Sequence, residues 1–145
     1  MPAETQNFEN HARFVPLYHR VTFPIFAVNL LWSVYRVIHR FSAESVLSLF
    51  LAVAFLLLFF YARIFALTVQ DRVIRLEMRL RLHQVLPPDL RARIPEFEVG
   101  QLVALRFAGD AELPELARKV LDEKLNDRKA IKKMIRDWQP DFLRA

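Results

Sequence analysis

Val46 to Ala62, VLSLFLAVAFLLLFFYA, is the stretch that decides the fold, because it runs without a charged residue. With Ser45 before it, the stretch approaches the ~20 residues that a helix needs to cross the hydrocarbon core of a bilayer. A helix that is apolar on every side otherwise belongs in the core of a large protein, and 145 residues cannot supply such a core. We therefore expect a transmembrane helix over about 45–65.

A second apolar stretch, Val21 to Ile38, precedes it and predicts another span over about 21–38. Pro24 must then lie in the first turn of this helix, where proline is tolerated. Arg36 lies near the far end, where its stem can follow the helix while the guanidinium reaches the headgroups. A cleavable signal peptide is the alternative, but the apolar stretch begins late and is long for one. We favour a retained span.

Only His39 to Glu44 separate the two stretches, so we expect them to form an antiparallel hairpin, 21–67. Orientation follows from the distribution of Lys and Arg, which favour the cytoplasmic side. The side of the connection carries Arg36 and Arg40, whereas seven basic residues and three acidic ones lie from Arg63 to Arg93. We therefore expect both termini on the cytoplasmic side, with 1–20 as an interfacial segment.

The second span is expected to continue as a juxtamembrane helix, 68–86, because no helix breaker occurs before Pro87-Pro88. An apolar stripe follows 4, 3, 4 spacing along it, with a basic stripe beside it. The apolar stripe is Val69, Val73, Leu76 and Leu80, and the basic stripe is Arg72, Arg75 and Arg79. The spacing of charges also predicts ion pairs within the helix, from Asp71 to Arg75 and from Glu77 to Arg81.

Residues 87–145 are expected to form a small helical cytoplasmic domain of three further helical stretches without a strand. The first stretch is Val99 to Ala108, and Asp110 and Asp127 are expected to cap the next two. The last helix would present Ile131, Met134, Ile135 and Trp138 on one face before Pro140 ends it. Helices this short are unstable alone, so their apolar faces should close on each other. The predicted fold class is therefore an all-α membrane protein.

Motifs for catalysis are missing from the sequence. Two glycines cannot build a Gly-rich phosphate loop, and without cysteine there is no thiolate nucleophile or Cys-based metal site. The histidines lack metal-ligand spacing, so we interpret them as interfacial or exposed; they are His11, His19, His39 and His83. We expect no enzymatic activity, no cofactor and no metal.

Asn29, Ser33 and Arg36 are spaced 4 and 3, which places them on one face of the first span. An amide at mid-span lacks water and should find a hydrogen-bond partner. The favoured interpretation packs Asn29 and Ser33 against the small face of the second span, which is Ser45, Ser48 and Ala52. The alternative is contact with a second copy or another membrane protein. A water-filled pathway would require several copies.

Basic side chains near the membrane are candidates for contact with anionic lipid headgroups or an acidic partner. These residues are Arg63, Arg72, Arg75, Arg79, Lys129, Lys132, Lys133 and Arg136. The favoured interpretation of the last helix is a solvated basic face over an apolar core stripe. Nucleic acid is the least favoured partner, because the basic excess is modest and lacks interleaved exposed aromatic residues.

The sequence also resembles a bacterial family of short, two-span membrane proteins catalogued as a domain of unknown function. The segments that carry the resemblance are Gln6 to His11, Tyr61 to Arg63, Gln70 to Glu77, Leu105 to Ala108 and Ile131 to Lys133. The resemblance covers nearly the whole chain and implies two spans followed by a helical cytoplasmic region. It further implies a multi-pass protein of the bacterial cytoplasmic (inner) membrane.

We therefore expect a membrane-anchored interaction or accessory module that presents a helical, basic cytoplasmic domain at the inner membrane. Its expected partners are the lipid bilayer, anionic headgroups, and another membrane protein or a second copy of the chain. The alternative function is that of a small oligomeric transporter or channel subunit.

Overall fold

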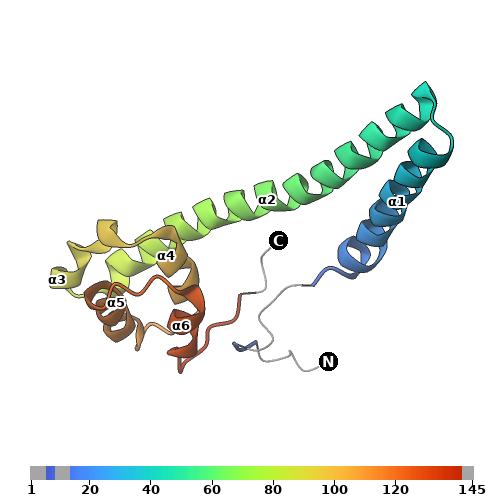
Figure 1. The fold of residues 1–145 in the computed structure, drawn as a ribbon. Coiled ribbons are helices and arrows are strands. Elements are labelled where there is room, and N and C mark those ends of the chain that lie inside the picture. The colour runs from blue at the N-terminus through green and yellow to red at the C-terminus, as the bar shows by residue number, and fades with distance from the viewer. Residues whose placement is uncertain (1–5, 9–13, 142–145) are drawn as a thin grey trace. The chain divides into compact units, whose positions relative to one another are not determined.

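The computed structural model describes residues 6–8 and 14–141, and these form helices and connections without a named strand (Figure 1). The chain divides into two compact units, with the boundary between Leu67 and Thr68. We call the described part of the first unit, 14–67, the hairpin unit. The second unit, described over 6–8 and 68–141, is the helical domain.

The hairpin unit begins with a π-helical turn, η1 (Leu17–Thr22), and continues directly into α1 (Phe23–His39). Pro24 lies in the first turn of α1, as predicted, and a turn of wider hydrogen bonding precedes that helix. In that turn the N–H of Phe23 donates to the carbonyl of Tyr18, five residues back. The π turn ends just before Pro24, which has no N–H to donate.

Helix α2 (Ala43–Val85) follows after a tight connection, and its first part forms the second arm of the hairpin. Ser42 and Ser45 cap its start reciprocally: each hydroxyl oxygen accepts the backbone N–H of the other, at 3.1 and 3.0 Å. Arg36 also reaches across the connection to Glu44, at 3.2 Å. These polar contacts hold the turn between two helices that both carry apolar side chains.

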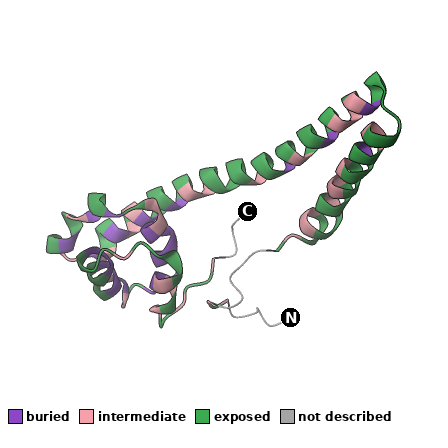
Figure 2. Cartoon of the chain, in the orientation of Figure 1, coloured by how far each residue is buried: buried purple, intermediate pink, exposed green. Residues whose placement is uncertain are grey.

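Aromatic side chains join the two arms of the hairpin unit. Phe26 stacks on Phe55, with ring centroids 5.7 Å apart, and Tyr18 stacks on Phe59 at 4.0 Å. The other faces remain open, as the green ribbon in Figure 2 shows for both arms. Leu17–His39 and Ala43–Val85 are both long and apolar enough to cross a membrane.

The helical domain is built on the last part of α2, which remains one helix with the apolar segment, as predicted. The other elements are α3 (Pro88–Arg91), the 3-10 turn η2 (Ile94–Glu96), α4 (Val99–Leu105), α5 (Leu113–Asp122) and α6 (Arg128–Lys133). Ile74, Met78 and Leu82 of α2 enter its core. They pack in one cluster with fully buried residues of the shorter helices, which include Leu102, Leu105, Leu113, Val120 and Ile131.

The 4, 3, 4 stripe on α2 is not part of this core. The side chains of Val69, Val73, Leu76 and Leu80 are all exposed, by 49 to 62%. Helix α2 carries two apolar stripes on different faces, and the domain covers the stripe that contains Ile74 and Met78. Periodicity by itself cannot tell which of two apolar faces the rest of the chain will cover.

The ion pairs predicted within α2, from Asp71 to Arg75 and from Glu77 to Arg81, are wrong. Asp71 and Arg81 each have a partner elsewhere in the domain. Asp71 lies 3.7 Å from Arg128 of α6, and Arg81 lies 2.7 Å from Asp110 in the α4–α5 connection. An i,i+4 pair on a solvated face gains only a few tenths of a kcal/mol. An ion pair with a residue that the tertiary fold brings close can therefore replace the pair within the helix.

One predicted cap is confirmed and the other is wrong. The carboxylate of Asp127 accepts the N–H of Lys129 at 2.8 Å and so caps α6. Asp110 does not cap α5, which begins at Leu113, because its carboxylate binds Arg81. The stretch expected from Val99 to Ala108 ends as a helix at Leu105.

Trp138 is not on the last helix, because α6 ends at Lys133. It pairs instead with Ala108 in an isolated antiparallel bridge, and its ring stacks on Phe107 at 4.5 Å. The N–H of Gly109 donates to the carbonyl of Asp137 at 2.9 Å. An isolated bridge involves too few residues to produce an alternation of apolar and polar residues, so the sequence pattern could not predict it.

Candidate functional site

The polar face predicted on α1 is divided between the inside and the outside of the hairpin unit. Ser33 is 4% exposed, whereas Asn29 is exposed. Positions four apart differ by about 40° around a helix, which is enough to place the two side chains on either side of the edge of the packed face. Ser33 is thus buried within the hairpin unit, whereas Asn29 faces outward and lines a shallow apolar hollow with Val28 and Trp32.

Arg36, the third residue of this face, lies at the hairpin connection with a carboxylate partner, Glu44. The predicted small face of α2 is buried at Ser45 and Ala52. Ser45 also caps the start of α2, a role that its spacing did not predict. In the hairpin unit, then, Asn29 is the member of the predicted polar set that faces outward.

The basic residues predicted along α2 have different surroundings. Arg72 and Arg75 are exposed in the helical domain, whereas Arg79 is partly buried. Arg63 belongs to the hairpin unit, where it lines a small hollow with Tyr18 and other residues. The exposed Arg72 and Arg75 are therefore the α2 residues best placed for an external partner.

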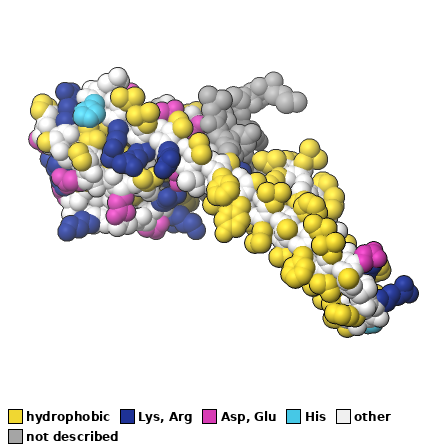
Figure 3. Space-filling view, turned by 90° about the horizontal axis from the view of Figure 1, so that it is seen from above, with side chains coloured by type: hydrophobic (Ala, Val, Ile, Leu, Met, Phe, Trp, Pro, Cys, Tyr) yellow, Lys and Arg dark blue, Asp and Glu magenta, His cyan; other side chains and the backbone are white. Residues whose placement is uncertain are grey.

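The basic residues near α6 do not form one free face. Lys132 lies over the ring of Phe107, with its Nζ 5.0 Å from the centroid, and Lys133 lies 5.8 Å from the centroid of Phe8. Arg136 follows the end of α6, and its backbone N–H donates to Glu112. Lys129 and Arg136 remain exposed. Intramolecular contacts therefore use part of the predicted basic surface. Figure 3 shows charged side chains over the helical domain and hydrophobic ones over the hairpin unit.

A groove in the helical domain lies between α2 and the C-terminal segment, lined by Arg81, Arg106 and Asp141 among others. Arg106 Nε is 3.2 Å from a carboxylate oxygen of Asp141, and Arg81 binds Asp110. Both guanidinium groups are thus neutralised by carboxylates. The groove is consequently not built to attract an anion.

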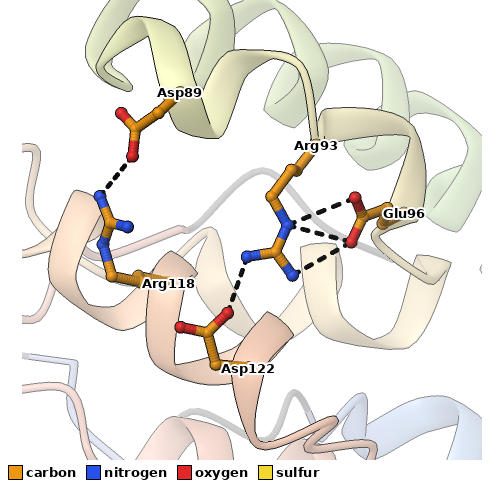
Figure 4. Close-up of polar contacts among 5 residues, drawn as sticks. All are labelled: Asp89, Arg93, Glu96, Arg118 and Asp122. Atoms are coloured by element: carbon orange, nitrogen blue, oxygen red, sulfur yellow. Dashed lines mark hydrogen bonds and ion pairs between the residues drawn. The ribbon is translucent and has the colours of Figure 1, made fainter.

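Two separate groups of ion pairs connect α3 and η2 with α5 in the helical domain (Figure 4). Arg118 donates to Asp89 at 2.6 Å, and this hydrogen bond holds the pKa of Asp89 below its ordinary value of 3.8. Arg93 donates to Asp122 at 2.7 Å and also binds Glu96 at 3.1 Å. The bond to Asp122 is the main reason why the pKa of Arg93 is raised. These opposite charges link α5 to α3 and η2, which precede α4 in the chain.

A metal centre is not formed among the residues that the structure describes, where no three His, Asp or Glu side chains gather. His11 lies outside the described residues. The Nδ1 of His19 lies 2.9 Å from the carbonyl of Val15, and the Nδ1 of His39 lies 3.0 Å from that of Tyr35. These are local contacts within a helix or at its start.

A family model matches the whole chain, residues 1–145, and its description is a family of unknown function (DUF6526). The chain belongs to this family. No curated protein and no solved structure shows significant similarity to it. Function must therefore be argued from the residues themselves.

Two contacts of the helical domain have no counterpart in the sequence patterns. Gln6 exchanges hydrogen bonds with the backbone of Asp141, at 2.8 and 3.2 Å. Gln101, which is 5% exposed, donates to the carbonyl of Leu125 and accepts from the N–H of Glu98. Glu98 and Gln101 form a capping box at the start of α4, but glutamate is outside the Ser, Thr, Asp and Asn set that marks an N-cap in a sequence, so their spacing gave no signal.

Proposed function

We propose that the protein is a membrane-anchored interaction or accessory module of the bacterial inner membrane. In this proposal the hairpin unit spans the bilayer twice, and the helical domain lies in the cytoplasm with both chain termini. The module has no catalytic role; it presents helical surfaces to partners at the membrane.

The observation that carries the proposal is the exposure of large apolar side chains on both arms of the hairpin unit. Leu31 is 70% exposed on α1, and Phe50 and Leu58 are 68 and 65% exposed on α2. Exposure of such surfaces to water costs about 25 cal/mol of free energy for each Å² of apolar area. Hydrocarbon removes this cost, and helices satisfy their own backbone hydrogen bonds there.

The distribution of basic residues supports the proposed orientation. Arg36, one of the basic residues near the connection, is paired with Glu44, whereas Arg72 and Arg75 are exposed on the other side of the apolar segment. Positive charge that flanks a span favours the cytoplasmic side. The same residues could bind anionic headgroups, at about 1 kcal/mol for each residue close to the surface.

Carbonate extraction and protease protection test this proposal. We expect the full chain to remain in membranes washed at high pH, and a tag after Ala145 to be cleaved only when the cytoplasmic face is accessible. Release of the chain by carbonate would overturn the membrane anchor. Cleavage of the tag from outside intact cells would overturn the orientation.

The alternative function is a small oligomeric transporter or channel subunit. The exposed amide of Asn29 favours it, because a polar group in hydrocarbon requires a partner. Two spans cannot enclose a pathway, so this function requires several copies around a shared pore. Solute flux through reconstituted vesicles that depends on Asn29 would favour this alternative over the accessory module.

A further inference from the structure

We propose that the exposed stripe on α2 is a dimer interface, in which two copies of the chain form a short parallel coiled coil. The stripe consists of Val69, Val73, Leu76 and Leu80, and all four residues belong to the helical domain. This inference rests on the membrane anchor proposed above, because insertion in one orientation makes the two helices parallel.

The spacing of the stripe fits a coiled coil. Its intervals of 4, 3 and 4 residues are those of a heptad repeat with apolar residues at positions a and d. Val73 and Leu80 then occupy a positions, and Val69 and Leu76 occupy d positions. The central pair, Val73 at a and Leu76 at d, has the combination of a β-branched residue and leucine that favours two strands over three or four.

The charges beside the stripe match a parallel arrangement. In a parallel dimer, a residue at g faces the residue at e of the next heptad on the partner helix, five positions later. Arg72 is at g and Glu77 is at e, and both side chains are exposed. Two-fold symmetry forms the Arg72–Glu77 pair twice, so opposite charges flank the apolar seam on both sides.

The ordered helix lowers the cost of association. Ile74 and Met78 hold the opposite side of α2 in the core of the helical domain, at 5 and 3% exposure. The stripe is therefore presented by a helix that is already formed, so that dimerisation orders only side chains. A seam of about two heptads is short, but confinement to one membrane raises the effective concentration of the second copy.

Cysteine cross-linking tests the interface directly, because the native chain has no cysteine. We would place Val73→Cys or Leu76→Cys in the full-length protein and oxidise native membranes mildly. Facing a and d positions bring the two sulfur atoms within disulfide reach. We expect disulfide-linked dimers in at least several-fold excess over Arg75→Cys, a matched control on an exposed c position. Equal yields at all three positions, or no dimer at Val73→Cys and Leu76→Cys, would overturn the interface.

Charge reversal tests the partner and the direction of the helices. In the Val73→Cys background, Arg72→Glu or Glu77→Arg should reduce the cross-linked fraction several-fold, because each places like charges at the seam. The double variant should restore it. An interface with a different protein, or with lipid headgroups, would leave the double variant no better than the single ones, and that result would overturn the proposal.

Carbonate extraction of the same membranes separates this inference from the proposed function. A chain that resists extraction and does not cross-link keeps its membrane anchor and loses the dimer. A chain that is released by carbonate loses the anchor, and the argument for parallel helices fails with it.

Discussion

Arg81 lies 2.7 Å from the carboxylate of Asp110, twenty-nine residues away in the chain. The same guanidinium donates to the carbonyls of Arg106 and Ala108, at 3.1 and 2.6 Å. One side chain of α2 thus satisfies three acceptors in the segment between α4 and α5. It also orders the chain that leads into the bridge between Ala108 and Trp138.

Replacing Arg81 with methionine should destabilise the helical domain by about 2 kcal/mol, because it removes a charged donor from two partly buried carbonyls. Methionine keeps much of the apolar stem, so the loss reports the hydrogen bonds. Hydrogen-exchange mass spectrometry of the full chain in detergent should show faster exchange over 106–113. Arg75→Met on the exposed face is the control, and equal exchange in both variants would contradict this role.

Gly109→Ala should also destabilise the domain, by about 1–3 kcal/mol. A Cβ at Gly109 would overlap the Oδ2 atom of Asp137 and lie 2.7 Å from its Cγ atom. The side chain of Asp137 would have to turn away, and its Cβ, at 3.1 Å, leaves little room beside the bridge at Trp138. Denaturation followed by Trp138 fluorescence, in a Trp32→Phe background, measures the change. Gly100→Ala is the control, because its Cβ meets only the side chain of Arg128, at 3.0 Å. A Gly109→Ala variant as stable as this control would contradict the close approach.

The Asp89–Arg118 pair predicts a loss of stability in acid. Because the folded-state pKa of Asp89 is held below 3.8, the pair stabilises the folded domain above that value. The contribution disappears as the pH falls through the folded-state pKa. Asp89→Asn should therefore be less stable than the wild type at neutral pH, and the difference should shrink as the pH falls below 3.8 and the carboxylate becomes protonated.

The pKa of Asp89 itself can be followed by carboxyl NMR of the purified protein. Arg118→Gln should move it upward toward 3.8, because the hydrogen bond that lowers it is lost. Glu123→Gln, on the exposed end of α5, is the matched control and should leave it unchanged. An unaltered titration in Arg118→Gln would show that the pair does not form in solution.

Asn29→Leu should weaken contacts of the hairpin unit with other membrane helices without lowering its insertion. An intramembrane amide contributes about 0.6–2 kcal/mol to such contacts, which corresponds to a roughly three- to thirty-fold change in affinity. Cross-linking in native membranes followed by mass spectrometry measures the loss of neighbours. Val28→Leu is the adjacent control. Unchanged neighbours in Asn29→Leu would mean that the exposed amide has no protein partner.

The family assignment and the helical class follow from features that the sequence displays openly. The continuity of α2 through Ala62 and Leu67 could be predicted because no proline or glycine interrupts it. The cap at Asp127 could be predicted because a short acidic side chain before a helical pattern satisfies free N–H groups. These are local properties, and each depends on residues within a few positions of one another.

Tertiary contact decided the rest. The sequence by itself determined that two long apolar helices are joined by a tight turn and followed by a small helical domain, since hydrophobic period and helix breakers are written along the chain. The sequence could not determine that Ile74 rather than Val73 enters the core, or that Arg81 pairs with Asp110 rather than with Glu77. Both outcomes depend on contacts with residues that are distant in the sequence. These contacts, and the free energy that they contribute, form only when the helices pack together.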